Sequence, residues 1–187
     1  MKPIRKARET LKWLRILGLL AFGFALMIAA SIGGLMVQYP VRSALWHCTH
    51  GKYVYLGKNQ LKLPLLWWHD RDEDVGTIVL MRGVVDDRIA FMPSELHLTP
   101  QKPGKTIKDD QSAEAIQNKL VSKTRFVPII ITAPVGKIYC VRDQSNPRFS
   151  ALFCFSAKVP WNLNFFPGSG DNAQAEGEAE SILATLK

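Results

Sequence analysis

The sequence has little cysteine and none of the common catalytic signatures. Three cysteines in 187 residues are too few for a small domain scaffolded by disulfides. The 13 glycines follow no repeat, which excludes a collagen-like chain, and an apolar content of 47% excludes an intrinsically disordered one. The patterns G-x-S-x-G, Walker A, H-E-x-x-H and G-x-G-x-x-G are all absent. We therefore predict a non-catalytic protein and expect no cofactor.

Charged residues are missing from one long stretch near the N-terminus. Residues 16–37 contain no charge, and a helix of this length spans about 33 Å, close to the roughly 30 Å hydrocarbon core of a bilayer. The preceding residues 1–15 carry six basic side chains and one acidic side chain, which orients such a helix with its N-terminus in the cytoplasm. The prediction is a basic cytoplasmic tail (1–15), a transmembrane helix (16–37), a tether and first strand region (38–51) and an extracytoplasmic domain (52–187), with the lipid bilayer as one partner.

The apolar stretch has an alternative interpretation as a cleavable signal peptide. Ala29, Ala30 and Ser31 offer small residues for a signal peptidase, and the outer region would then be secreted. The stretch is longer than the usual apolar region of a signal peptide, about 7–15 residues, and this favours a retained anchor.

Small residues recur at every fourth position of the same stretch, at Ala21, Ala25, Ala29 and Gly33. On a helix they form one face, on which a second copy of the chain or another membrane helix could pack closely. The alternative is that these residues reflect only the usual frequency of Ala and Gly in membrane helices. The face predicts a homodimer through the membrane helix.

The region after residue 37 has the pattern of an ordinary folded domain. Of the formal net charge of +8, only +3 lies there, so a nucleic-acid partner is not expected. Short apolar runs separated by Gly, Pro, Asn and Asp indicate strands, and apolar residues at helical spacing indicate helices at about 109–123 and from about 173. Strands in runs, without regular alternation with helices, predict an α+β fold with a mainly antiparallel sheet and about two packed helices.

Two short segments resemble a known family. In residues 53–68 an aromatic strand leads through Lys62, Leu63 and Pro64 to a pair of tryptophans, and this resembles the opening strands of PsbP-like and Mog1-like domains. Residues 178–187 are similar to the closing helix of those domains. The resemblance covers 26 residues of the chain and implies an antiparallel sheet flanked by helices, in a small binding or assembly-support domain without catalysis.

Two of the cysteines occupy matching positions in a predicted hairpin. If residues 137–142 and 150–157 pair around Pro147, Cys140 lies opposite Cys154, at a separation that suits a disulfide. Such a bond requires an oxidising compartment, as the predicted topology provides. Two buried free thiols are the alternative. Cys48 has no predicted partner within the chain and is either a buried apolar residue or an intermolecular partner.

Candidate site residues are few. Trp67 and Trp68 are adjacent, so on a strand one faces the core and the other faces solvent, the membrane or a partner, where it could form a binding surface. Packing of both tryptophans in the core is the alternative. A second hypothesis is an anchored or exported hydrolase whose site is built from His69, Asp70 and His97, whose side chains would then converge on one pocket. The remaining acids of the segment 70–74 are expected to form a solvated turn.

Metal ligation is not expected from the sequence. His47 and His50 are separated by an odd number of positions, and Cys48 lies between them in the sequence. On a strand the two histidines would therefore point to opposite faces.

The leading hypothesis is a membrane-anchored, extracytoplasmic binding or assembly-support protein. A toxin-neutralising immunity-type membrane protein is a further alternative, permitted by size and topology alone.

Overall fold

The computed structural model describes residues 3–73, 76–82, 93–102, 104, 106–123, 125–146, 150–168 and 172–187, and for residues 3–16 and 32–37 the backbone only. The chain divides into two compact units, Met1–Gln38 and Tyr39–Lys187. The first helix, α1 (Pro3–His50), begins in the first unit and ends in the second.

In the first unit, every residue from 17 to 31 is exposed. The exposed side chains include large apolar ones: Leu17, Leu19, Leu20, Phe22, Phe24, Leu26, Met27 and Ile28. Among the described residues, none of the helices has the combined length and hydropathy of a membrane span. The transmembrane helix predicted for residues 16–37, some of whose side chains lie outside the described ones, stays a prediction.

The tether predicted for residues 38–51 is wrong, because α1 continues to His50 and passes through Pro40. A proline inside a helix removes one backbone hydrogen bond and normally ends or bends the helix. Contacts within the second unit compensate here. The Ser43 hydroxyl donates to the carbonyl of Leu65, and Nε2 of His47 donates to the carbonyls of Pro64 and Trp67, at 3.0 and 2.9 Å.

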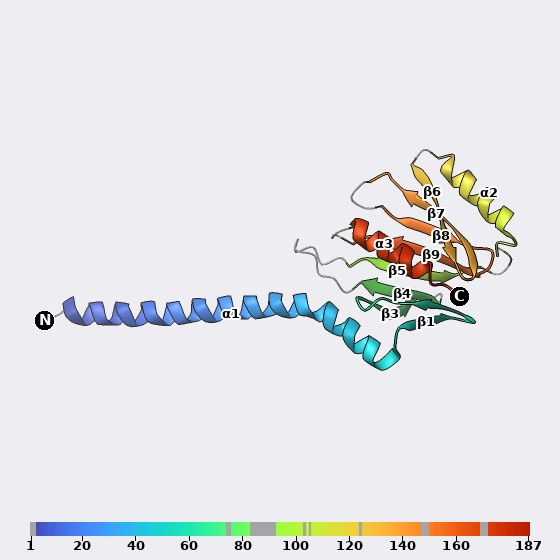
Figure 1. The fold of residues 1–187 in the computed structure, drawn as a ribbon. Coiled ribbons are helices and arrows are strands. Elements are labelled where there is room, and N and C mark those ends of the chain that lie inside the picture. Colours follow the sequence, from blue (N-terminus) through green and yellow to red (C-terminus); the bar gives the residue numbers. More distant parts are fainter. Residues whose placement is uncertain are drawn as a thin grey trace. The chain divides into compact units, whose positions relative to one another are not determined.

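Nine strands lie in the second unit, among the residues described there: β1 (Tyr53–Leu56), β2 (Asn59–Lys62), β3 (Trp67–Glu73), β4 (Thr77–Arg82), β5 (Glu95–Pro100), β6 (Phe126–Ala133), β7 (Gly136–Asp143), β8 (Leu152–Phe155) and β9 (Trp161–Phe166). Seven of them form one sheet in the order β3-β4-β5-β9-β8-β7-β6 (Figure 1). Every pairing in it is antiparallel. The prediction of an α+β fold with a mainly antiparallel sheet is confirmed.

Two helices pack on opposite faces of this sheet. The helix α3 (Asn172–Leu183) covers the face that carries Leu80, Leu96, Cys140 and Leu163, which is called here the α3 face. The helix α2 (Asp110–Val121) packs against Tyr139 and Phe155 on the other face, the α2 face. Because side chains alternate along a strand, Cys140 and Tyr139 point to different helices.

The two helices are held by different means. Ala175, Ala179, Ile182 and Leu183 of α3 enter the main core, as the predicted apolar face requires. Helix α2 is capped at its N-terminus by Asp109, whose carboxylate accepts from the amide of Ser112. Hydrogen bonding by the side chain of Ser112, and then by its backbone amide, lowers the pKa of Asp109. Helices α2 and α3 together place a helical layer on each side of the sheet.

The small sheet β1-β2 covers one edge of the core. Gly57 begins its turn at a φ of 64°, a left-handed conformation that favours glycine. Pro64 separates the end of β2 from the start of β3, because proline cannot donate to a strand ladder. Lys187 exchanges two backbone hydrogen bonds with Gln60, of 2.8 and 3.2 Å, and these hold β2 in place.

The predicted cysteine hairpin is confirmed in register and in chemistry. Strands β7 and β8 pair Cys140 with Cys154 and Tyr139 with Phe155, and the two sulfur atoms form a disulfide. The Cα atoms of the two cysteines are 4.0 Å apart. The third cysteine, Cys48, is exposed and free, so the prediction that it is a buried apolar residue is wrong.

Candidate binding groove

The α2 face of the sheet is only partly covered by a helix. Helix α2 lies over β6 and β7, whereas β9 and β5 carry polar side chains on the same face. Cross-strand pairing places Asn162 opposite Thr99 and Asn164 opposite His97. All four are half-buried. A groove between α2 and these strands is the natural candidate for a binding site.

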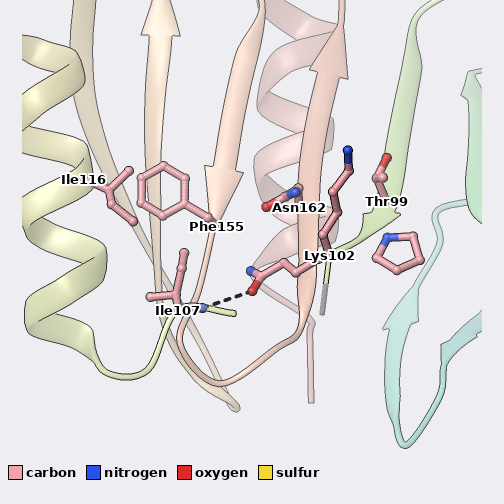
Figure 2. Close-up of a pocket in the computed structure, with 8 residues that line it drawn as sticks. Thr99, Lys102, Ile107, Ile116, Phe155 and Asn162 are labelled. Carbon is pink, nitrogen blue, oxygen red and sulfur yellow. Dashed lines mark hydrogen bonds between the residues drawn. The ribbon is translucent and has the colours of Figure 1, made fainter. Parts of the chain in front are cut away.

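The groove has a volume of about 330 Å³ and is lined by Thr99, Pro100, Gln101, Lys102, Ile107, Ile116, Phe155 and Asn162. Figure 2 shows the apolar side chains of Ile107, Ile116 and Phe155 gathered beside α2, and the polar ones of Lys102, Thr99 and Asn162 on the other side. The groove therefore has one apolar wall and one wall of hydrogen-bonding groups.

The amide of Gln101 is oriented by the backbone. Its Oε1 accepts from the amide of Ile107 at 3.2 Å, and this contact fixes which end of the side chain is the oxygen. Among the described residues its buried Nε2 has no hydrogen-bond partner. A buried donor without a partner costs about 1–3 kcal/mol, and the side chain that carries it lines the groove.

An aromatic row continues across the α2 face beyond the groove. His97, Phe166, Phe153 and Phe126 follow one another with ring centroids 5.0, 6.1 and 6.5 Å apart, each pair edge-to-face. Phe166 is 39% exposed. We call these four residues the aromatic row. Edge-to-face rings stabilise one another and here form a partly exposed apolar strip.

The structure does not bring the predicted hydrolase residues together. His69 pairs with Leu80, whereas His97 pairs with the adjacent Val79, so the two imidazoles lie on opposite faces of the sheet. The prediction that these side chains converge on one pocket is wrong. His69 bonds to Asp72 at 2.9 Å, and His97 to Glu95 at 2.7 Å.

Asp70 has a different partner again. Its carboxylate accepts from Arg71 at 3.0 Å, and this hydrogen bond raises the pKa of Arg71. The turn predicted for residues 70–74 is also wrong in part, because β3 extends to Glu73. A bulge between His69 and Arg71 re-aims the acidic side chains and keeps them at the surface, so the strand tolerates them.

A second cavity, of about 390 Å³, contains one of these histidines. It is lined by Trp46, His50, Tyr53, Val54, Tyr55, His69, Asp72 and Ile78. His50 stacks on Trp46 and bonds through Nδ1 to the Thr49 hydroxyl. The lining includes no serine, threonine or cysteine, so the pair of His69 and Asp72 has no alcohol or thiol in the cavity to activate. Within the described residues, no three His, Cys, Asp or Glu side chains gather as a metal site needs.

The exposed tryptophan surface is wrong and the alternative of core packing is confirmed, because both tryptophans are buried. They do face opposite ways, as adjacent strand residues must. Trp67 enters the main core and donates from Nε1 to Glu178. Trp68 lies against Tyr39 of α1, with ring centroids 6.0 Å apart. The helical segment that replaces the predicted tether is what covers Trp68.

The small-residue positions of α1 are described in part. Ala21, Ala25 and Ala29 are exposed, whereas the side-chain position of Gly33 lies outside the described residues. Their role in a homodimer stays a prediction. No protein-family model matches the chain, and no curated protein is significantly similar to it.

Sequence reasoning missed the groove residues. Residues 100–108 carry proline, glycine and lysine and no apolar period, which is typical of a loop, and nothing in their composition distinguishes Gln101 or Lys102 from surface residues. One signal was available in β9, where Asn162 and Asn164 alternate with Leu163 and Phe165. This alternation marks a strand with a polar face in the middle of a sheet.

Proposed function

We propose that the chain is a single-pass membrane protein that presents its second unit outside the cytoplasm, where the unit binds a protein or envelope component without catalysis. The observation that carries the proposal is the exposed apolar segment at residues 17–31 of α1. It belongs to the 22-residue stretch without charge that follows the basic tail. Leucine and phenylalanine side chains exposed on every side of a helix are suited to lipid.

A retained anchor is favoured over a cleaved signal peptide. The candidate cleavage positions Ala29, Ala30 and Ser31 lie in the middle of α1, which continues for a further 19 residues to His50. The disulfide between Cys140 and Cys154 supports an oxidising compartment for the second unit. Both observations agree with the orientation that the basic tail predicts.

The α2 face is the proposed binding surface. It combines the aromatic row with the half-buried amides of Asn162 and Asn164 on β9. Partly exposed aromatic side chains are typical of surfaces that bind partners. The resemblance of residues 53–68 and 178–187 to PsbP-like and Mog1-like domains supports the same class of function, assembly support through binding.

Membrane retention tests the anchor. We expect the full chain to stay with the membranes after an alkaline wash, and the variant Leu20→Lys/Phe24→Lys to be released, since two charges in this segment oppose burial in lipid. Leu45→Lys is the matched control, because Leu45 is equally an exposed leucine of α1 but lies outside the proposed span. Wild-type protein in the washed supernatant would overturn the proposal.

Cross-linking from two exposed apolar positions tests the binding surface. A photoreactive phenylalanine analogue at Phe166, in the aromatic row, should give one adduct of defined mass in cells. The same analogue at Tyr55, which is exposed on β1 away from the α2 face, is the matched control and should give none. Equal labelling from both positions would show that the aromatic row is not the binding surface.

A further inference from the structure

We propose that the groove between α2 and strands β5 and β9 binds a small amphipathic anion, a carboxylate attached to a short apolar body. The inference adds a ligand site to the proposed partner surface and does not depend on the membrane topology. It is drawn from the three kinds of group that line the groove in Figure 2: an apolar wall, free hydrogen-bond donors and a single cation.

The apolar wall accounts for the body of the ligand. Ile116 is 39% exposed although it occupies the middle of α2, and it lies beside Ile107 and the largely buried Phe155. Burying apolar surface of a ligand against this wall favours binding. At about 330 Å³ the groove is near the lower limit of ligand pockets, so the apolar body must be short.

The donors account for an acceptor group on the ligand. Gln101 has a buried Nε2 without a partner among the described residues, while its oxygen is already engaged by the amide of Ile107. The side chain of Asn162 adds a second amide, half-buried on the central strand β9. Carboxylate oxygens accept several hydrogen bonds each, so a carboxylate is the group that matches a wall of donors.

The charge of the lining selects an anion. Lys102 is the one charged side chain among the eight lining residues, and none of them is acidic. No ion pair engages Lys102 among the described residues. An ammonium group with free donors beside unpartnered amides attracts a carboxylate and repels a cation.

Calorimetric titration of the full chain tests the inference. The protein is kept in a non-ionic detergent at constant concentration, because α1 exposes leucine and phenylalanine side chains. The probes are 4-phenylbutyrate and hexanoate, which distinguish an aromatic from an aliphatic body, with their neutral amides and inorganic phosphate as comparisons. We expect saturable one-site binding of at least one carboxylate, and binding at least about tenfold weaker for its amide and for phosphate.

Three variants locate the binding. Lys102→Gln should weaken carboxylate binding about tenfold, because it removes the cation and leaves an exposed side chain of similar length. Ile116→Glu should weaken it at least as much, by placing a carboxylate on the apolar wall. Lys123→Gln, an exposed lysine just beyond α2, is the matched control and should bind as wild type does.

Several outcomes would overturn the inference. These are the absence of saturable binding to the wild type, equal binding of carboxylates and their amides, phosphate binding as tight as carboxylate binding, and wild-type affinity in Lys102→Gln. None of them bears on the alkaline-wash result, so failure of the ligand site and failure of the anchor are distinguishable.

Discussion

Arg82 on β4 and Glu178 on α3 form a two-pronged ion pair, with Nε 2.8 Å from Oε2 and Nη2 2.8 Å from Oε1. The arginine side chain is 6% exposed and the carboxylate 22%. Trp67 donates to the same carboxylate at 2.8 Å, so three donors from two strands converge on it. On β7, Arg142 pairs with Glu176 and Glu180 of the same helix. Helix α3 is thus fastened to the sheet by two arginines as well as by its apolar face.

Glu178→Gln should lower the free energy of unfolding by about 2–4 kcal/mol, because it leaves the buried charge of Arg82 without a counter-ion. Chemical denaturation followed by tryptophan fluorescence measures this. Glu180→Gln is the matched control: Glu180 is a more exposed carboxylate of the same helix, 3.3 Å from Arg142, and its loss should cost less than about 1 kcal/mol. Equal effects of the two substitutions would contradict the role given to Arg82.

The same carboxylate makes stability depend on pH. Burial would raise the pKa of Glu178, but hydrogen bonds from Arg82 and Trp67 outweigh it and hold the pKa below the ordinary value of 4.5. A group whose pKa is lower in the folded state stabilises the fold above its unfolded pKa and loses that contribution as the pH falls through the folded value. The wild type should therefore lose more stability than Glu178→Gln between about pH 5 and pH 3. Parallel denaturation curves at both pH values would contradict this assignment.

The disulfide predicts a thiol count and a loss of stability. The denatured, unreduced protein should show one free thiol, that of Cys48, and three after reduction. Replacement of Cys140 and Cys154 by serine opens a 15-residue loop and should lower the free energy of unfolding by about 3 kcal/mol. Three free thiols before reduction would show that the bond does not form.

Substitutions at Leu186 and Lys187 should have different effects on the free energy of unfolding. Leu186 is fully buried, and its carbonyl accepts from the amide of Val135, whereas Lys187 contributes mainly backbone hydrogen bonds to Gln60. Leu186→Ala should cost about 2–4 kcal/mol in unfolding free energy. Lys187→Ala retains the backbone contacts and should change it by less than about 0.5 kcal/mol. Similar losses at both positions would contradict this account of the C-terminal contacts.

Local patterns carried the fold prediction further than the site prediction. The cysteine hairpin was predictable because two apolar runs lie symmetrically about Pro147, so that one register pairs Cys140 with Cys154. The ion pair between Arg82 and Glu178 joins residues 96 positions apart. Nothing local signals such a contact, because Arg82 ends an apolar strand like any surface residue.

The predictions of the tether, the tryptophan surface and the histidine pair are wrong for one physical reason. In each case tertiary contacts override the local structural preference of the sequence. Residues 38–50 were expected to leave the helix at Pro40, yet packing against β3 maintains the helix. The same packing buries Trp68, which the alternation of the strand left free for a partner. His69 and His97 look like a pair in the sequence, and only the register of β3, β4 and β5 separates them onto two faces. The groove depends on where α2 lies over the sheet, which no single segment specifies.

The measurement that tests the central claim most directly is labelling of Cys48 in intact cells with a membrane-impermeant maleimide. Cys48 is exposed in the last turn of α1, and the other two cysteines are bonded to each other, so the full chain offers one reactive thiol. Labelling should occur without permeabilisation and should disappear in Cys48→Ser. A cysteine introduced in that background by Thr10→Cys, in the basic tail, should react only after permeabilisation. Labelling of Cys48 only after permeabilisation, or of Thr10→Cys without it, would contradict an anchored protein whose second unit lies outside the cytoplasm.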